Sequence, residues 1–203
     1  MSEISEAIEK AKEGEKIEIG EGFNRKIALV IAILALFLSF SETLGKGAQT
    51  EAATKNIEAS DLWAFFQAKS IRTTVVTTAA EQMAVTVAGA TDQAAKDAMQ
   101  KQIDAWKKTA VRYDSEPSTN EGRKELAERA KAAEEERDLS MAKYHHYELS
   151  SAAFQIGIVL ASAAVITGMV LLAWFAGLLG LVGAGLLALG IFAPHAVPFI
   201  ATL

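Results

Sequence analysis

The sequence predicts an all-α integral membrane protein with three transmembrane helices and a helical extramembrane domain between spans 1 and 2. Two observations carry this prediction. Apolar runs at residues 27–44 and 152–193 flank a segment that holds most of the charge in the chain. After Glu148 no Lys, Arg, Asp or Glu follows. A bilayer imposes this partition, because charged side chains are costly inside hydrocarbon.

The composition fits this class and excludes others. The 203 residues are 51% hydrophobic and only 22% charged, which is too apolar for a soluble domain of this length. A net charge of −5 argues against a nucleic-acid partner, since phosphate recognition needs clustered Lys and Arg. The chain has no Cys, which excludes disulfides, thiol catalysis and Cys-ligated metals. We expect membrane lipid around the chain and no cofactor.

Residues 1–25 are predicted to be an acidic tail with a short amphipathic helix. Glu6 and Lys10 are paired at helical spacing, and Gly14 is predicted to end the helix. The apolar residues of the tail recur at the same spacing: Ile4, Ala7, Ile8 and Ala11. We favour a solvated tail over a helix on the membrane surface or a partner-binding helix.

Residues 26–44 are predicted as the first transmembrane helix, since roughly 20 apolar residues cross a hydrocarbon core of about 30 Å. Arg25 and Lys26 precede the apolar run and are assigned to the membrane interface. Glu42 lies at the other end, where we expect an interfacial carboxylate rather than a gate or proton site. The alternative is a cleaved signal peptide, but the preceding tail is long and acidic, and no Ala-x-Ala cleavage motif directly follows the apolar run.

The run at 152–193 is too long for one helix and suits a hairpin of two. We predict transmembrane helices at 151–174 and 177–194, followed by a short apolar tail at 195–203. Trp174 is assigned to the membrane interface, and Gly177 offers the backbone freedom for a reversal. The turn is therefore predicted at residues 174–177.

Small residues recur on one face of each helix of this hairpin, which allows close packing between helices or between copies of the chain. On the second span they are Ala153, Gly157, Ala161, Ala164 and Gly168. On the third span they are Gly177, Gly180, Ala184 and Ala188. The alternative is that small residues are merely common in membrane helices.

Positive charge near the spans suggests an orientation. Three crossings put the N-terminal tail on one side and the central domain with the C-terminus on the other. Arg25 and Lys26 favour a cytoplasmic tail and an exported central domain. Lys46, Arg137 and Lys143 on the other side weaken this assignment.

The domain at 45–150 is predicted to be helical throughout, because its apolar residues recur at spacings of three and four, and its helices are expected to pair as a coiled coil. Its first helix is expected to be buried over a broad face made of two stripes. One stripe contains Ile57, Ala64, Ala68, Ile71, Val75 and Ala79. The other contains Leu62, Phe66, Val76, Ala80 and Met83.

Trp63 and Phe66 are expected to pack against the helix after Pro117, with a partner-binding anchor as the alternative.

Two breaks divide this domain. Gly89, Thr91 and Asp92 resemble a C-cap glycine followed by an N-cap. Pro117 ends helical propagation, and residues 116–120 are predicted as a turn. The helix between the breaks carries a stripe of Ala95, Met99, Ile103, Trp106, Ala110 and Tyr113.

The last helix of the domain is predicted to begin with a capping box formed by Ser118 and Glu121. No Gly or Pro occurs between Gly122 and the second span, so one helix is expected to continue into the membrane. The charged residues at 134–137 are interpreted as its solvated face.

Aromatic and histidine side chains gather where this helix approaches the second span, at Tyr144, His145, His146 and Tyr147. Adjacent helical residues point about 100° apart, so one helix cannot direct both His side chains at one metal. We interpret all four as interfacial residues with a polar tip, and expect no metal site. His195 is likewise given a surface or interfacial role.

Three stretches together resemble a bacterial membrane family described as a domain of unknown function, number 4337. They are ASDLWAFFQAKSIR at 59–72, YDSEPSTNEGRKEL at 113–126 and QIGIVLASAAVITG at 155–168. The resemblance implies a bacterial inner-membrane location, with the central domain in the periplasm under the orientation above. It implies no activity and assigns no catalytic residue.

We therefore expect a non-enzymatic, self-associating scaffold or accessory subunit of a membrane assembly. Its expected partners are lipid, further copies of the chain and another membrane protein complex. No nucleophile, base and orienting group can be nominated together, and spans 2 and 3 carry no ionisable residue of a pump. The alternative is an oligomeric channel whose pore is lined by Ser39 and Ser41 or by the glycines of the third span.

Overall fold

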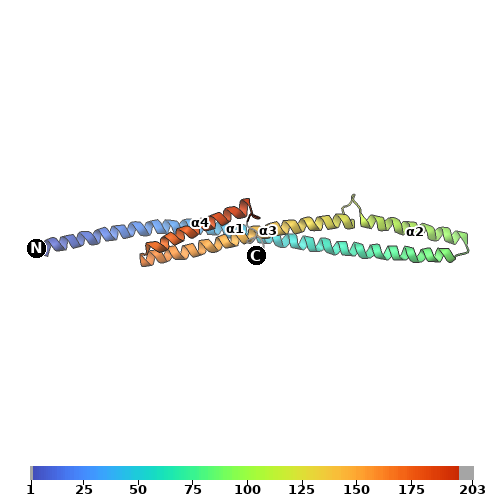
Figure 1. Ribbon diagram of the computed structural model, residues 1–203, viewed down its shortest axis with the longest axis horizontal. Coiled ribbons are helices and arrows are strands. Elements are labelled where there is room, and N and C mark those ends of the chain that lie inside the picture. Colours follow the sequence, from blue (N-terminus) through green and yellow to red (C-terminus); the bar gives the residue numbers. More distant parts are fainter. Residues whose placement is uncertain (1, 197–203) are drawn as a thin grey trace. The chain divides into compact units, whose positions relative to one another are not determined.

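The protein is all-α. The computed structural model describes the backbone of residues 2–196 and the side chains of residues 22–196. It contains four helices, α1 (Ser2–Gly89), α2 (Gln93–Asp114), α3 (Arg123–Thr167) and α4 (Val170–Phe192) (Figure 1). Three of them, α1, α3 and α4, are long and apolar enough to cross a membrane, and α2 lies between the first and second of these in the chain.

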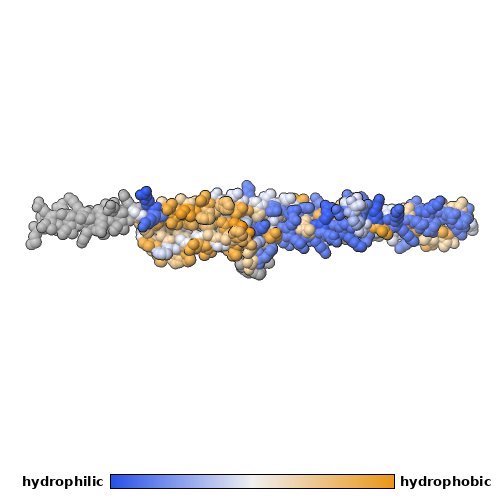
Figure 2. All heavy atoms as spheres, turned by 90° about the horizontal axis from the view of Figure 1, so that it is seen from above, coloured by the Kyte–Doolittle hydropathy of each residue, from blue (hydrophilic) through white to orange (hydrophobic). Residues whose placement is uncertain are grey.

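The chain divides into two compact units. Unit 1 comprises Met1–Thr50 and Leu139–Leu203, and unit 2 comprises Glu51–Asp138. Hydrophobic residues cover most of the described surface of unit 1, whereas most of the surface of unit 2 is hydrophilic (Figure 2). The surface of unit 1 therefore favours apolar surroundings, and the surface of unit 2 favours water.

The N-terminal part of α1 differs from the prediction. The helix end expected at Gly14 is wrong, because α1 continues without interruption to Gly89. A single glycine costs a helix only about 1 kcal/mol relative to Ala, and no proline occurs before Pro117. The expected pairing of Glu6 with Lys10 lies outside the residues whose side chains are described.

The break between α1 and α2 is as predicted. α1 ends at Gly89, and the Asp92 carboxylate accepts hydrogen bonds from the backbone N–H groups of Ala94, at 3.3 Å, and Ala95, at 3.2 Å. Two of the backbone donors that the start of a helix leaves unpaired are satisfied in this way. α2 then lies beside the last turns of α1 (Figure 1).

The turn between α2 and α3 is also confirmed, but its predicted capping box is wrong. α3 begins at Arg123, so Ser118 and Glu121 both precede the helix. Instead Glu125, in the first turn of α3, accepts hydrogen bonds from the Ser115 hydroxyl at 2.6 Å and the Glu116 N–H at 3.1 Å. This carboxylate ties the end of α2 to the start of α3.

α3 continues unbroken from Arg123 to Thr167, which confirms that one helix joins the charged domain to the second apolar segment. The hairpin turn lies earlier than predicted. Gly168 adopts a φ of +69°, and only Gly168 and Met169 separate α3 from α4. Glycine adopts this left-handed conformation freely, which makes Gly168 the helix-ending residue. Trp174 and Gly177, where the turn was expected, lie inside α4.

Unit 2 has its own hydrophobic core. It is formed by Ala59 and Leu62 of α1 with Leu126, Ala130 and Ala133 of α3. Ten buried or half-buried residues of α1 in this unit recur at alternating spacings of three and four, the pattern of a heptad seam. They are Ala52, Lys55, Ala59, Leu62, Phe66, Lys69, Thr73, Val76, Ala80 and Met83. Six further residues beside this seam are half-buried: Trp63, Phe65, Ala68, Ser70, Ala79 and Val87.

The broad buried face expected for this part of α1 is therefore wrong. The stripe of Leu62 and Phe66 packs inward, whereas Ile57, Ile71 and Val75 of the neighbouring stripe are exposed. A single helical neighbour covers one narrow seam rather than both stripes.

Unit 1 packs α1 against the hairpin of α3 and α4. Ile27 of α1 is buried with Ala161 and Ala164 of α3 and Ala176 of α4. Further along, Ala48, Tyr147 and Leu187 form a second buried cluster from the same three helices.

Candidate interaction surfaces

The predicted small residues bring the three helices of unit 1 together. A Cβ atom added at Gly157 would lie 3.3 Å from the Ala176 carbonyl oxygen and 3.3 Å from Leu34 Cδ1. One added at Gly180 would lie 2.6 Å from Leu34 Cδ2. Because Gly157 and Gly180 have no side chains, Leu34 of α1 packs against both of them, and α3 and α4 approach each other closely.

The other small residues predicted to pack differ in how deeply they are buried. Ala153 and Ala161 are buried, and Ala184 is half-buried. Gly168 is exposed and forms the turn, so its predicted packing role is wrong. Gly177 is exposed, with nothing within 4 Å of an added Cβ.

The face of α4 that packs against the neighbouring helices differs from the predicted face. It includes two glycines that were not predicted, Gly183 and Gly190. An added Cβ at Gly183 would lie 2.9 Å from the Phe154 ring, and one at Gly190 would lie 2.7 Å from the Tyr147 ring. The signal in the sequence was the alternation of three and four among small and apolar residues. The buried set is Ala176, Gly180, Gly183, Leu187 and Gly190.

Two serines join helices inside unit 1. The Ser41 hydroxyl donates to the Tyr147 carbonyl at 3.0 Å, and the Ser150 hydroxyl donates to the Gly183 carbonyl at 2.8 Å. Ser41 is fully buried, so its suggested role in lining a pore is wrong for this structure. Ser39, by contrast, is exposed.

Three of the predicted interface residues, Glu42, Tyr144 and Tyr147, line one groove between α1 and α3, with a volume of about 520 Å³. Glu42 accepts a hydrogen bond from the Gln155 amide at 3.2 Å, and the Tyr144 hydroxyl donates to Glu148 at 3.3 Å. Tyr147 is almost wholly buried among the helices of unit 1.

The remaining predicted interface residues lie elsewhere in unit 1. Arg25, Lys26 and Trp174 are all exposed. Lys26 and Trp174 line a second groove, between α1 and α4, which is almost entirely apolar.

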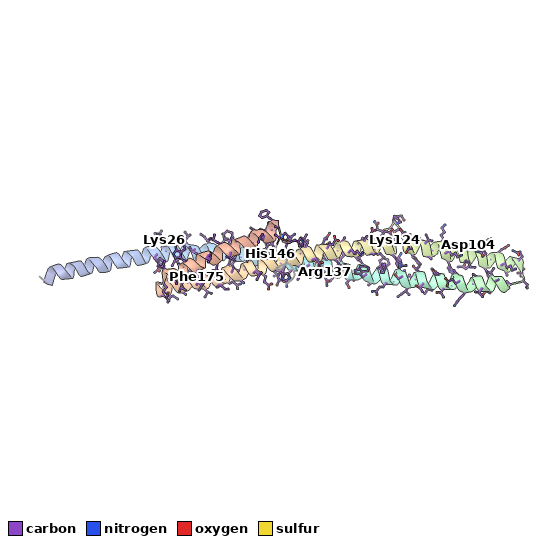
Figure 3. The ribbon with its side chains drawn as sticks, in the orientation of Figure 1. Lys26, Asp104, Lys124, Arg137, His146 and Phe175 are labelled. Atoms are coloured by element: carbon purple, nitrogen blue, oxygen red, sulfur yellow. The ribbon has the colours of Figure 1, made fainter. Side chains whose placement is uncertain are left out.

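His146 is buried rather than interfacial, which corrects its predicted role (Figure 3). Its Nδ1 atom lies 2.9 Å from the Ala142 carbonyl, to which it donates. Its Nε2 atom is buried and has no hydrogen-bond partner among the described residues. His145 is half-buried, and its ring lies 3.9 Å from Glu148.

In unit 2, Trp63 and Phe66 belong to the core, which confirms the prediction that they pack against the helix after Pro117. Their rings meet edge to face with centroids 5.4 Å apart, and both pack against the cluster around Leu126. The Trp63 indole N–H donates to Glu134 at 2.9 Å. Glu134 is therefore an exception to the predicted solvated face at 134–137.

The sequence did not reveal the surroundings of Lys69, which is buried at a seam position of α1. Its ammonium lies 5.4 Å from the centre of the Phe65 ring and 5.1 Å from that of the Tyr113 ring. Glu116 and Glu121 each approach it to 4.0 Å. Cation–π and ionic attraction together hold the turn after α2 against α1.

Exposed apolar residues follow the outer face of α1 in unit 2. Ile57, Ile71, Val75 and Val85 are exposed by 63%, 65%, 61% and 76%. We call these four residues the outer stripe. Along residues 71–89 the only charged side chains are Arg72 and Glu81, one of each sign. Apolar residues aligned along an otherwise hydrophilic unit are typical of an interaction surface.

These features define a helical protein with three candidate membrane-spanning helices and an exposed apolar stripe. The chain belongs to the family described as a domain of unknown function, DUF4337, whose model matches residues 23–193. Neither curated proteins nor solved structures give a match to this chain.

Proposed function

We propose that this chain is a non-enzymatic membrane scaffold or accessory subunit that crosses a bacterial inner membrane three times and self-associates through unit 2. The exposed apolar residues of the outer stripe support self-association. The exposed apolar residues of unit 1 support membrane insertion.

Insertion is supported by large exposed hydrophobic residues on the helices of unit 1. Leu29 and Leu36 of α1 and Leu181 of α4 are exposed by 63%, 70% and 73%. At about 25 cal/mol per Å² of apolar surface, leaving such side chains in water is unfavourable, and lipid removes that cost.

The chemistry of the outer stripe favours a second copy of the chain as its partner. Along residues 71–89, which include three of the four stripe residues, the only charged side chains are Arg72 and Glu81, so few charged groups lose water when two copies pair there. A two-fold interface places the same patch on both subunits, which such a surface allows. The small apolar residues between Val75 and Val85 permit close approach of the two helices.

Self-association is tested with the full chain in a mild detergent, by light scattering coupled to gel filtration. Ile71→Glu combined with Val75→Glu places two carboxylates on the stripe and is expected to convert the oligomer to monomer. Both residues are exposed, so folding is not disturbed. The matched control is Val111→Glu, which charges an equally exposed valine on α2. A wild-type monomer, or a double variant that remains oligomeric, contradicts the proposal.

The orientation is proposed from Arg25 and Lys26, which place the N-terminal tail in the cytoplasm and unit 2 in the periplasm. The chain has no Cys, so single cysteines introduced as Ser5→Cys and Thr91→Cys can each be labelled alone. In intact cells with a permeabilised outer membrane, an impermeant maleimide is expected to label position 91 and not position 5. The reverse pattern contradicts the orientation, and labelling of both contradicts three crossings.

A further inference from the structure

The apolar groove in unit 1 suggests a ligand. It lies between the first described turns of α1 and the start of α4, and its volume is about 610 Å³. This volume lies within the roughly 300–1,000 Å³ of small-molecule sites. Phe23, Val30 and Leu178 contribute apolar walls, and Lys26 is the only charged lining residue in the part of the chain whose side chains are described.

We propose that this groove binds one acyl chain of an anionic phospholipid, with the lipid phosphate at Lys26. The inference rests on the membrane insertion proposed above. It does not depend on self-association, because the groove lies in unit 1 and the outer stripe lies in unit 2.

The length of the groove fits a lipid of one leaflet. Its lining on α4 runs from Val170 to Leu181, a span of 11 residues or about 16 Å at the helical rise of ~1.5 Å per residue. This is about half of a hydrocarbon core of ~30 Å. An acyl chain that begins at one membrane surface therefore ends within the groove.

The charge of the groove selects an anionic headgroup. Lys26 lies at the end of the groove near the start of α4, and Arg25 precedes it in the chain (Figure 3). Among residues 22–196, whose side chains are described, no carboxylate lines the groove. A Lys at the surface of an anionic leaflet contributes about 1 kcal/mol, which corresponds to roughly fivefold enrichment of the anionic lipid.

Two glycines of α4 provide a matched pair of variants. Gly177 lines the groove, and an added Cβ there meets nothing within 4 Å, so Gly177→Leu introduces a side chain into the groove from an open position. Gly185 is also exposed with nothing within 4 Å of an added Cβ, but it lies outside the groove. Gly185→Leu therefore adds the same side chain to the same helix and leaves the groove open.

Trp174 reports occupancy, because it lines the groove and is the only Trp of unit 1. With Trp63→Phe and Trp106→Phe as background, the full chain is reconstituted in phosphatidylcholine vesicles. One preparation contains about 10 mol% phosphatidylglycerol with brominated acyl chains, and the other the same fraction of brominated phosphatidylcholine. Bromine quenches Trp fluorescence on contact.

We expect brominated phosphatidylglycerol to occupy the site about fivefold more than brominated phosphatidylcholine, as read from Trp174 quenching. Gly177→Leu and Lys26→Gln are expected to remove this preference, and Gly185→Leu to retain it. Equal quenching by both lipids overturns the proposal. Protection of Trp174 from both lipids, in protein that floats with the vesicles, also overturns it and indicates a second copy in the groove. Failure to float with the vesicles at all contradicts membrane insertion instead.

Discussion

The Ser41 hydroxyl donates a hydrogen bond to the Tyr147 carbonyl, 3.0 Å away and 106 residues later in the chain. The bond is buried and joins α1 to α3 within unit 1. Hydrogen bonds of this kind between membrane helices contribute modestly, because the separated helices find other partners.

We therefore expect Ser41→Ala to lower the free energy of unfolding by about 0.5–1 kcal/mol. Unfolding of the full chain by increasing denaturing detergent, followed by circular dichroism, measures the change. Ser39→Ala is the control, because Ser39 is exposed and two residues away. Equal effects of the two substitutions would show that the buried bond is not what stabilises this region.

Gly183 is expected to tolerate no side chain. An added Cβ would lie 2.9 Å from the ring of Phe154, which is itself only 1% exposed and has little room to move. We expect Gly183→Ala to lower the free energy of unfolding by about 1–3 kcal/mol through overpacking.

Gly185→Ala is the control for that prediction. Nothing lies within 4 Å of its added Cβ, and Ala favours a helix over Gly by about 1 kcal/mol. The two substitutions in the same detergent titration should thus change stability in opposite directions. A neutral Gly183→Ala would contradict the close packing of α4 against α3.

Replacing His146 by Leu is expected to change stability little. The Nε2 atom is buried without a partner among residues 22–196, and such an acceptor is unfavourable, so removing it offsets the loss of the bond to Ala142. His146→Ala, in contrast, leaves a cavity and is expected to cost about 2–4 kcal/mol. Thermal unfolding in detergent compares the two. A Leu variant as unstable as the Ala variant would indicate that Nε2 has a favourable partner.

Glu125 gives the turn before α3 a dependence on pH. Hydrogen bonds from the Ser115 hydroxyl and from backbone N–H groups lower the pKa of Glu125 from its ordinary value of 4.5. A carboxyl whose pKa is lower in the folded state stabilises the fold fully above 4.5. The stabilisation from Glu125 is lost as the pH falls below 4.5 and through the lower pKa of the folded state. In this range the Glu125 carboxylate of the unfolded chain takes up a proton more readily than that of the folded chain.

Stability of wild type should therefore fall more steeply between about pH 5 and pH 3 than that of Glu125→Gln, which cannot ionise there. Thermal midpoints measured across this range give the two slopes. Glu128→Gln, on the first turns of the same helix, is the control and should keep the wild-type slope. Identical slopes for wild type and Glu125→Gln would contradict the role of this carboxylate.

Much of the fold could be predicted because it is local. Apolar run lengths identified three candidate spans, and the residues at Gly89, Asp92 and Pro117 marked both breaks in the charged domain. Each of these features acts within a few residues of the chain. Neighbouring helices were not needed to recognise them.

Other features depend on which helix faces which, and there the prediction was wrong. α1 carries two apolar stripes with similar spacing, and only packing against α2 and α3 decides that Leu62 turns inward and Ile71 outward. Gly168 and Gly177 are both glycines in an apolar run, but only a backbone with positive φ distinguishes the turn from a helix interior. The burial of Tyr147 and His146 was not predicted, because it depends on α4, which their own helix does not reveal.

The two-residue connection formed by Gly168 and Met169 bears on how the protein is made. In the proposed topology, α3 and α4 have no loop between them that could be translocated separately. We therefore expect α3 and α4 to enter the membrane together as a hairpin. Lengthening this connection should allow them to enter one after the other.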